Sequence, residues 1–176
     1  MKLIRRSVAV LGLTLIAISS GLAQETCKRN VEAGVSLCVP DGWTIETKPD
    51  QKFKVFFAPA AETFTANINL KDDTSSASLA SYVADSIKQI LSNPPTIAAT
   101  SIKLVAWTDF ASASGVRGSR AVFETEYKGL LIRTIQYYLE AGENHKVIVT
   151  GTCLLKDKDT FDSVFERAAK SLRLDN

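Results

Sequence analysis

The sequence predicts an α+β fold, in which an antiparallel sheet of about six or seven strands carries packed amphipathic helices. Three observations indicate this class. Short stretches of alternating apolar and polar residues recur along the chain, as in strands that have one face buried. Tight turns containing glycine, proline or asparagine separate most of these stretches, and such turns join antiparallel neighbours. Two other stretches repeat their apolar residues with helical spacing.

Three short strands and one extended segment are expected before the first helix. The segment 35–39 alternates and stops at a proline–glycine turn over 40–42. An extended segment resumes at 43–45, and further strands are expected at 53–57 and 64–70.

The first helix is predicted over 78–92. Its apolar stripe runs from Leu79 through Val83 and Ile87 to Leu91, and preceding serines can cap its first turn. The run Asn93-Pro94-Pro95 should end the helix, because proline cannot continue it.

After the helix the period of two returns, and four more strands follow. They are expected at 100–107, 121–127, 131–139 and 147–154. A last helix should open at Asp159 as the capping residue, with a basic outer face near its C-terminal end.

The first 23 residues have the three parts of a secretory signal. A positive start with Lys2, Arg5 and Arg6 precedes an apolar run over 8–18, and Gly21-Leu22-Ala23 fits a signal-peptidase site. A spanning helix needs about 20 apolar residues, so this run favours cleavage over a membrane anchor. We therefore expect residues 1–23 to be a cleavable signal and residues 24–176 to form a single domain.

Cleavage changes the charge of the chain. The full sequence has 21 basic and 19 acidic residues, a net charge of +2. The signal takes three basic residues and no acidic one, which leaves 18 against 19. No basic cluster remains to suggest nucleic-acid binding.

Three cysteines would enter an oxidising compartment, where one disulfide can form. Cys27 and Cys38 flank a plausible tight turn, so a hairpin would bring them together. Chain entropy instead favours the longer loop of the alternative pair, Cys38 and Cys153. We predict Cys27–Cys38 and interpret Cys153 as a buried thiol at the end of a strand.

No catalytic, cofactor or metal site is expected. The one histidine, His145, lies at a polar turn and is interpreted as an exposed, ordinary residue. The acidic groups Asp72-Asp73 and Asp157-x-Asp159 lack the length and ligand count of a calcium loop. Asp72-Asp73 is expected to end a strand. Glu124 and Glu126 share a strand face with Arg120, which we interpret as solvated.

Aromatic residues are the remaining candidates for a binding surface. Most are expected in the core, but any left exposed on an incompletely covered sheet face would mark a binding patch. The candidates are Trp43, Trp107, Tyr127, Tyr137 and Tyr138.

The segment Gly34–Trp43 resembles the opening strand of the PsbP-like family, where a strand runs into a proline–glycine–tryptophan turn. The likeness continues through the helix at 78–92 and through Gly115–Phe123, where the family has a glycine-containing loop leading into a strand. It ends with 149–152 and the acidic-capped final helix. It covers roughly residues 35–174.

This resemblance implies an α/β/α sandwich and a non-catalytic role in assisting other proteins. Relatives include an extrinsic subunit of the oxygen-evolving complex, DcrB-like bacterial envelope proteins and chaperone-like cytoplasmic adaptors. No functional residue of the family carries over by position, because fold alone does not define a site.

The sequence thus predicts a periplasmic or secreted accessory protein of the cell envelope. It would not be an enzyme, would bind another envelope protein, and would not stay inserted in the membrane after signal removal. Two alternatives remain open. One is a periplasmic hydrolase that uses His145, and the other is a small-molecule carrier with an apolar cavity beneath the helices.

Overall fold

The computed structural model of the protein describes residues 27–32, 34–46, 54–93 and 99–175. The predicted signal, residues 1–23, lies outside them. In chain order the elements are β1 (Cys27–Glu32), β2 (Val35–Pro40), β3 (Thr44–Glu46), β4 (Val55–Phe57), β5 (Asn67–Thr74), α1 (Leu79–Ser92), β6 (Ala99–Ala111), β7 (Arg117–Tyr127), β8 (Leu130–Gly142), β9 (His145–Leu154), η1 (Leu155–Asp157), α2 (Lys158–Lys170) and β10 (Arg173–Leu174).

Seven strands form one antiparallel sheet in the order β3-β4-β5-β9-β8-β7-β6. The α+β class predicted from the sequence is therefore confirmed. The turn between β7 and β8 uses Lys128 and Gly129, whose φ angles are 51° and 77°. Two successive positive φ values match the twist of the flanking strands. β3 and β6 are the edges of the sheet.

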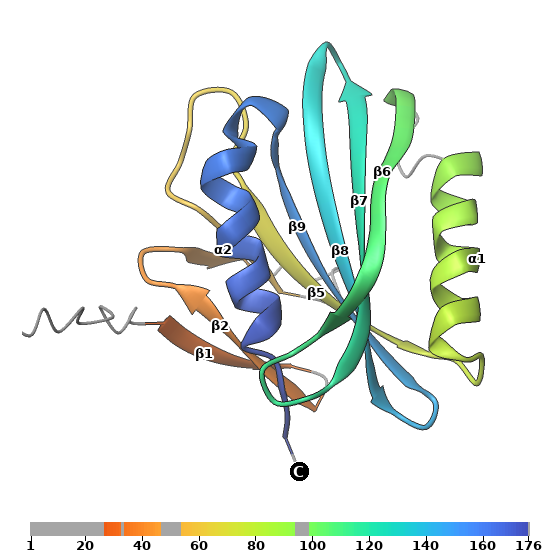
Figure 1. The fold of residues 1–176 in the computed structure, drawn as a ribbon. Helices are drawn as coiled ribbons and strands as arrows, with labels where there is room; N and C mark the ends of the chain where they lie inside the picture. The colour runs from red at the N-terminus through yellow and green to blue at the C-terminus, as the bar shows by residue number, and fades with distance from the viewer. Residues whose placement is uncertain (1–26, 33, 47–53, 94–98, 176) are drawn as a thin grey trace, which may run out of the picture.

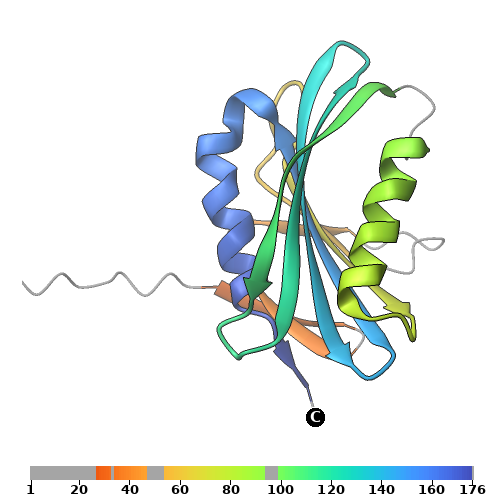
Figure 2. The same ribbon diagram turned by 45° about the vertical axis from the view of Figure 1, so that its right-hand side comes forward.

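The two helices cover opposite faces of this sheet (Figures 1 and 2). Alternate residues of a strand are therefore buried on opposite sides. On β7, Phe123 packs in the cluster under α1, and its neighbour Val122 packs in the cluster under α2. On β8, Tyr138 and Tyr137 divide in the same way. The expected helix–sheet–helix sandwich is confirmed.

α2 approaches β9 closely at Gly151. Phe165 of α2 is only 1% exposed, and its ring occupies the space where a Cβ atom on residue 151 would stand. A glycine is required here because the aromatic ring packs directly on the strand backbone.

A second, small sheet lies beside α2, in the order β1-β2-β10. The strand predicted at 35–39 belongs to this second sheet and not to the main one, a division that the single predicted sheet did not include. Val35, Leu37 and Val39 are at most 2% exposed and belong to the cluster under α2. The strand alternates because it covers one side of that core, which is also how an ordinary sheet strand reads.

The predicted helix limits hold for α1 and shift for α2. Ser78 caps α1, and its side chain accepts a hydrogen bond of 3.2 Å from the Ser81 amide. The prediction that Asp159 caps α2 is wrong. Asp157 occupies the N-cap position without a side-chain hydrogen bond, and Asp159 lies in the first turn, where the helix dipole still favours a carboxylate.

The backbone register bears on the predicted disulfide. Cys27 pairs with Pro40 and Cys38 pairs with Arg29, so the two cysteines are offset by two positions on neighbouring strands. Cys153 is free and buried, so the alternative bridge Cys38–Cys153 is not formed. The side chain of Cys27 lies outside the described ones, and Cys27–Cys38 stays a prediction. Among the described helices, none has the length and apolar character needed to cross a membrane.

Candidate functional site

β6 is an edge of the main sheet and carries exposed apolar side chains. It pairs with β7, and no other described strand pairs with its outer side. A register shift between Leu104 and Ala106 marks a bulge, and Val105 within it is 47% exposed. Trp107, just beyond, is 46% exposed. An open edge offers unpaired backbone groups to a further strand, and tryptophan is enriched among residues that dominate binding energy.

A hollow of about 970 Å³ lies beside Trp107, between the start of α1, the end of β6 and the start of β7. At its rim Arg117 forms an ion pair of 2.8 Å with Glu140. Lys146, wholly buried, lies 3.7 Å from the same carboxylate. Because the Arg117 side chain is 83% exposed, its pair contributes little to stability and can open toward a bound partner.

A second hollow, of about 660 Å³, lies between the end of β6 and α2. Arg120 of β7 lines it, together with the exposed Glu166 and Lys170 of α2. The Lys170 ammonium lies 4.7 Å from the centre of the Phe110 ring, which completes one wall. The last residues of β6 therefore separate two hollows.

Arg120 and Tyr137 are cross-strand neighbours beside this second hollow. Tyr137 is fully buried, and its ring packs against Phe110 with centroids 4.8 Å apart. Neither the Arg120 Nε atom nor the Tyr137 hydroxyl has a hydrogen-bond partner in the described part of the chain. Burial raises the pKa of Tyr137 to about 12, and the nearby Arg120 guanidinium opposes that rise. A buried Nε–H donor and a buried hydroxyl, which can donate or accept, therefore lie on neighbouring strands without a partner.

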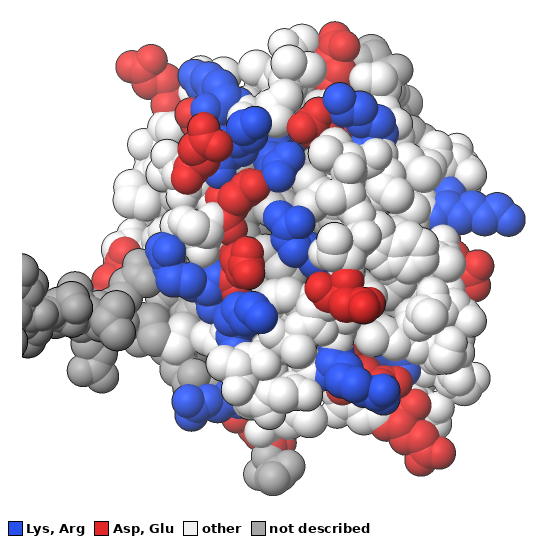
Figure 3. Space-filling view, viewed as in Figure 1, with Lys and Arg blue, Asp and Glu red and all other residues white. Residues whose placement is uncertain are grey.

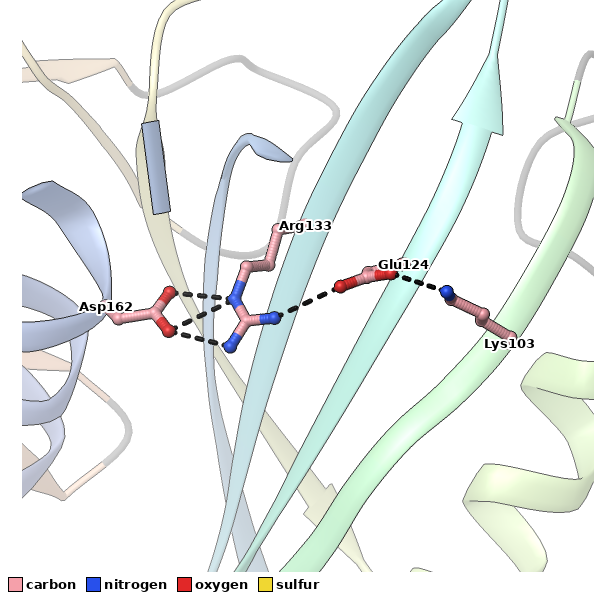
Figure 4. Close-up of polar contacts among 4 residues, drawn as sticks. All are labelled: Lys103, Glu124, Arg133 and Asp162. Carbon is pink, nitrogen blue, oxygen red and sulfur yellow. Dashed lines mark hydrogen bonds and ion pairs between the residues drawn. The ribbon is translucent and has the colours of Figure 1, made fainter. Parts of the chain in front are cut away.

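Arg133, on the same sheet face, is by contrast saturated with partners (Figure 4). Its guanidinium makes a bidentate contact with Asp162 of α2, with distances of 2.7 and 2.9 Å, and reaches Glu124 at 3.4 Å. Glu124 in turn pairs with Lys103 at 2.8 Å. The hydrogen bond to Asp162 raises the pKa of Arg133. Through these contacts the charged residues connect α2 to β8, β7 and β6.

The interpretation of the Glu124 face as solvated is therefore wrong at Glu124. The Glu124 side chain is 19% exposed and the Arg133 side chain 12%. Alternation along β7 correctly placed Arg120 and Glu124 together, but it could not reveal that α2 partly covers them. Figure 3 shows positive and negative side chains interspersed over α2 and the adjoining strands.

The acidic groups considered for calcium serve other purposes. Asp72 and Asp73 do not end β5 but pair within it with Val147 and Lys146. Asp73 also accepts a hydrogen bond of 2.8 Å from the Tyr82 hydroxyl. Among the residues that the structure describes, no three His, Cys, Asp or Glu side chains converge as metal ligands do.

His145 is the first residue of β9 and pairs with Gly142. It was predicted to be exposed, but it is half-buried. Of the aromatic candidates, Tyr137 and Tyr138 are core residues. Trp43 is partly buried and packs edge-on against Phe161 of α2, with centroids 6.4 Å apart. Trp107 remains as the exposed aromatic that the binding-patch hypothesis required.

Alkaline pH is expected to weaken the fold, because burial raises the pKa of the Cys153 thiol to about 12 and also raises the pKa values of Tyr82, Tyr137 and Tyr138. These groups titrate near 9 to 10 when unfolded. Their contribution is therefore complete below about pH 9 and is lost as the pH rises toward their folded values. Urea unfolding followed by circular dichroism should give a lower free energy at pH 11 than at pH 8. Equal values would contradict this assignment.

No protein-family model and no curated protein sequence matches the chain, but solved structures do. PsbP from the cyanobacterium Synechocystis sp. PCC 6803 is 11% identical, with a TM-score of 0.65 over 90% of this chain and 98% of that one. LpqN, involved in cell envelope biogenesis of Mycobacterium tuberculosis, is 14% identical, with a TM-score of 0.62 over 87% and 91%. PA94 of Pseudomonas aeruginosa, of unknown function, is 20% identical, with 0.58 over 82% and 94%.

Such low identities show the fold alone. The chain has the Mog1p/PsbP-like fold, which is named after PsbP and the Ran-binding protein Mog1p of Saccharomyces cerevisiae. The resemblance to the PsbP-like family is thus confirmed for architecture. The narrower likeness to DcrB-like proteins stays a prediction.

Proposed function

For a chain of the Mog1p/PsbP-like fold, we propose the role of an exported, non-catalytic accessory protein of the cell envelope. Its partner is an extended segment of another envelope protein, which adds to the sheet as a strand along β6. Main-chain hydrogen bonds supply affinity in this mode of recognition, and side-chain pockets supply specificity.

The single observation that carries the proposal is the open edge of β6 with Trp107 beside it. Trp107 is 46% exposed and borders the hollow of about 970 Å³ at the start of α1. An added strand would place alternate side chains in that hollow. Its rim bears Arg117, Glu140 and Asp109, so a mixed polar and apolar segment suits it.

The fold shared with LpqN supports a role in the cell envelope. LpqN is described as involved in cell envelope biogenesis, and this chain has its fold together with an expected export segment. An exported accessory protein that binds another envelope protein is consistent with both features.

Site-specific photo-crosslinking in cells tests the proposal. A benzophenone amino acid at Val105 is expected to crosslink to a different envelope protein, within an extended segment of that protein. The additional change Trp107→Ala should reduce the yield at least fivefold, because it removes the anchoring side chain.

The same probe at Lys88, an exposed position on α1, is the matched control and should give no such product. Equal products at both positions, or products only between copies of this chain, would overturn the proposal.

A further inference from the structure

The hollow between β6, β7 and α2 is lined by Arg120, whose buried Nε–H group has no acceptor among the described residues. Arg120 and Arg133 project from the same sheet face, on neighbouring strands. Arg133 has two carboxylate partners, Asp162 and Glu124. Arg120 has no ion pair within the described residues, and its buried Nε atom has no hydrogen-bond partner. A buried Nε–H group without an acceptor is unfavourable for stability, which points to a partner from outside the chain.

We propose that this hollow binds carboxylate-bearing ligands, with Arg120 as the charged anchor. This site is separate from the β6 edge and does not depend on the proposed docking there. The ligand carboxylate takes the outer N–H groups of Arg120, a residue that lines the hollow. The guanidinium is then held so that its Nε–H donates to the Tyr137 oxygen, and both unpaired atoms gain a partner.

The charges around the hollow favour one negative charge on the ligand. Arg120 and Lys170 contribute two positive charges, and Asp109 and Glu166 contribute two negative ones. Since these balance, a phosphate dianion would meet repulsion from the two acidic residues. A single carboxylate matches the planar fork of arginine and adds only one charge.

The size and lining of the hollow require a body behind the carboxylate. A volume of about 660 Å³ is within the range of small-molecule sites and far exceeds an acetate ion. Phe110 and Ala111 provide apolar contact. An aromatic or aliphatic acid fits this chemistry, and so does the free C-terminus of a peptide.

The walls of the hollow are held in place before any ligand arrives. The Ala113 amide donates a hydrogen bond of 2.7 Å to the Lys170 carbonyl oxygen. The Ser114 hydroxyl donates one of 2.8 Å to the Leu172 carbonyl oxygen. These bonds fix the end of α2 to the loop after β6, so little ordering cost remains for binding.

Nuclear magnetic resonance of the purified protein tests the proposal directly. Titration with 3-phenylpropionate is expected to shift the Arg120 Nε–H resonance saturably, and 3-phenylpropanamide, which has the same shape without the charge, should not. Arg120→Gln should weaken binding of the acid at least tenfold. Tyr137→Phe should weaken it about fivefold, because the Nε–H loses its acceptor.

Lys103→Gln is the control, since it removes a positive charge from the same sheet face outside the hollow. It should leave the affinity unchanged. The tripeptide Ala-Ala-Phe, with a free or an amidated C-terminus, distinguishes the two ligand sources. If the site binds peptide C-termini, the free tripeptide should bind more tightly than both its amide and 3-phenylpropionate. If it binds small acids, 3-phenylpropionate should bind at least as tightly as the free tripeptide. An unshifted Arg120 resonance, tighter binding of inorganic phosphate, or full affinity in folded Arg120→Gln would each overturn the assignment.

Discussion

Replacing Gly151 with alanine is expected to lower the free energy of unfolding by about 3 kcal/mol. The added Cβ would overlap the ring of Phe165, which is 1% exposed and packs α2 onto β9. Neither the strand backbone nor the buried ring can move without disturbing the rest of the core. Urea unfolding of the purified variant measures the loss.

A double-mutant cycle decides whether the close approach is the cause. Phe165→Ala alone should cost about 3 to 5 kcal/mol, because it leaves a cavity. In the double variant the alanine at 151 meets no ring, so the combined loss should be well below the sum of the single losses. Gly142→Ala is the control, since its Cβ would meet only ordinary contact at 3.5 Å. Additive losses in the cycle would contradict the proposed overlap.

Arg133→Gln is expected to lower the free energy of unfolding by about 2 kcal/mol, less than the roughly 3 to 5 kcal/mol typical of a fully buried ion pair, because this pair is partly buried. The Asp162 side chain, 29% exposed, would lose a bidentate partner, and Glu124 would keep only Lys103. The measurement is again urea unfolding, here at low and high salt.

Lys103→Gln provides the comparison at the exposed end of the same chain of charges. Its side chain is 70% exposed, so the loss should stay below about 0.5 kcal/mol and should shrink further with salt. Equal losses for Arg133→Gln and Lys103→Gln would show that burial of the pair contributes nothing.

Most elements of the fold could be predicted because each carries a local signal. The stripe from Leu79 to Leu91 specified α1, and alternation on β7 specified which residues share a face. The two-residue turn at Lys128 and Gly129 indicated a hairpin between the strands on either side of it. Such signals depend on neighbours in sequence, so they survive without knowledge of the rest of the molecule.

The candidate site could not be predicted, because its partners are distant in the chain. Arg120 and Arg133 look equivalent as basic residues in strands, and only the position of α2 gives one of them Asp162. The bulge at Val105 interrupts the alternation of β6. No glycine, proline or asparagine lies at this position, so the sequence carried no signal for the bulge. Trp107 was among the aromatic residues predicted to mark a binding patch if exposed, and its exposure follows from the edge position of β6.

The sequence by itself determined most strands of the main sheet, the two helices, the α+β class and the expectation of export, since periodicity and the N-terminal pattern are local properties. Tertiary structure alone decided that β2 leaves the main sheet, that Gly151 admits Phe165, and that Arg120 lacks the partner Arg133 has. The physical reason is the same in each case. Packing between elements sets which polar groups are paired and which surfaces stay open, and it depends on contacts across more than a dozen residues of chain.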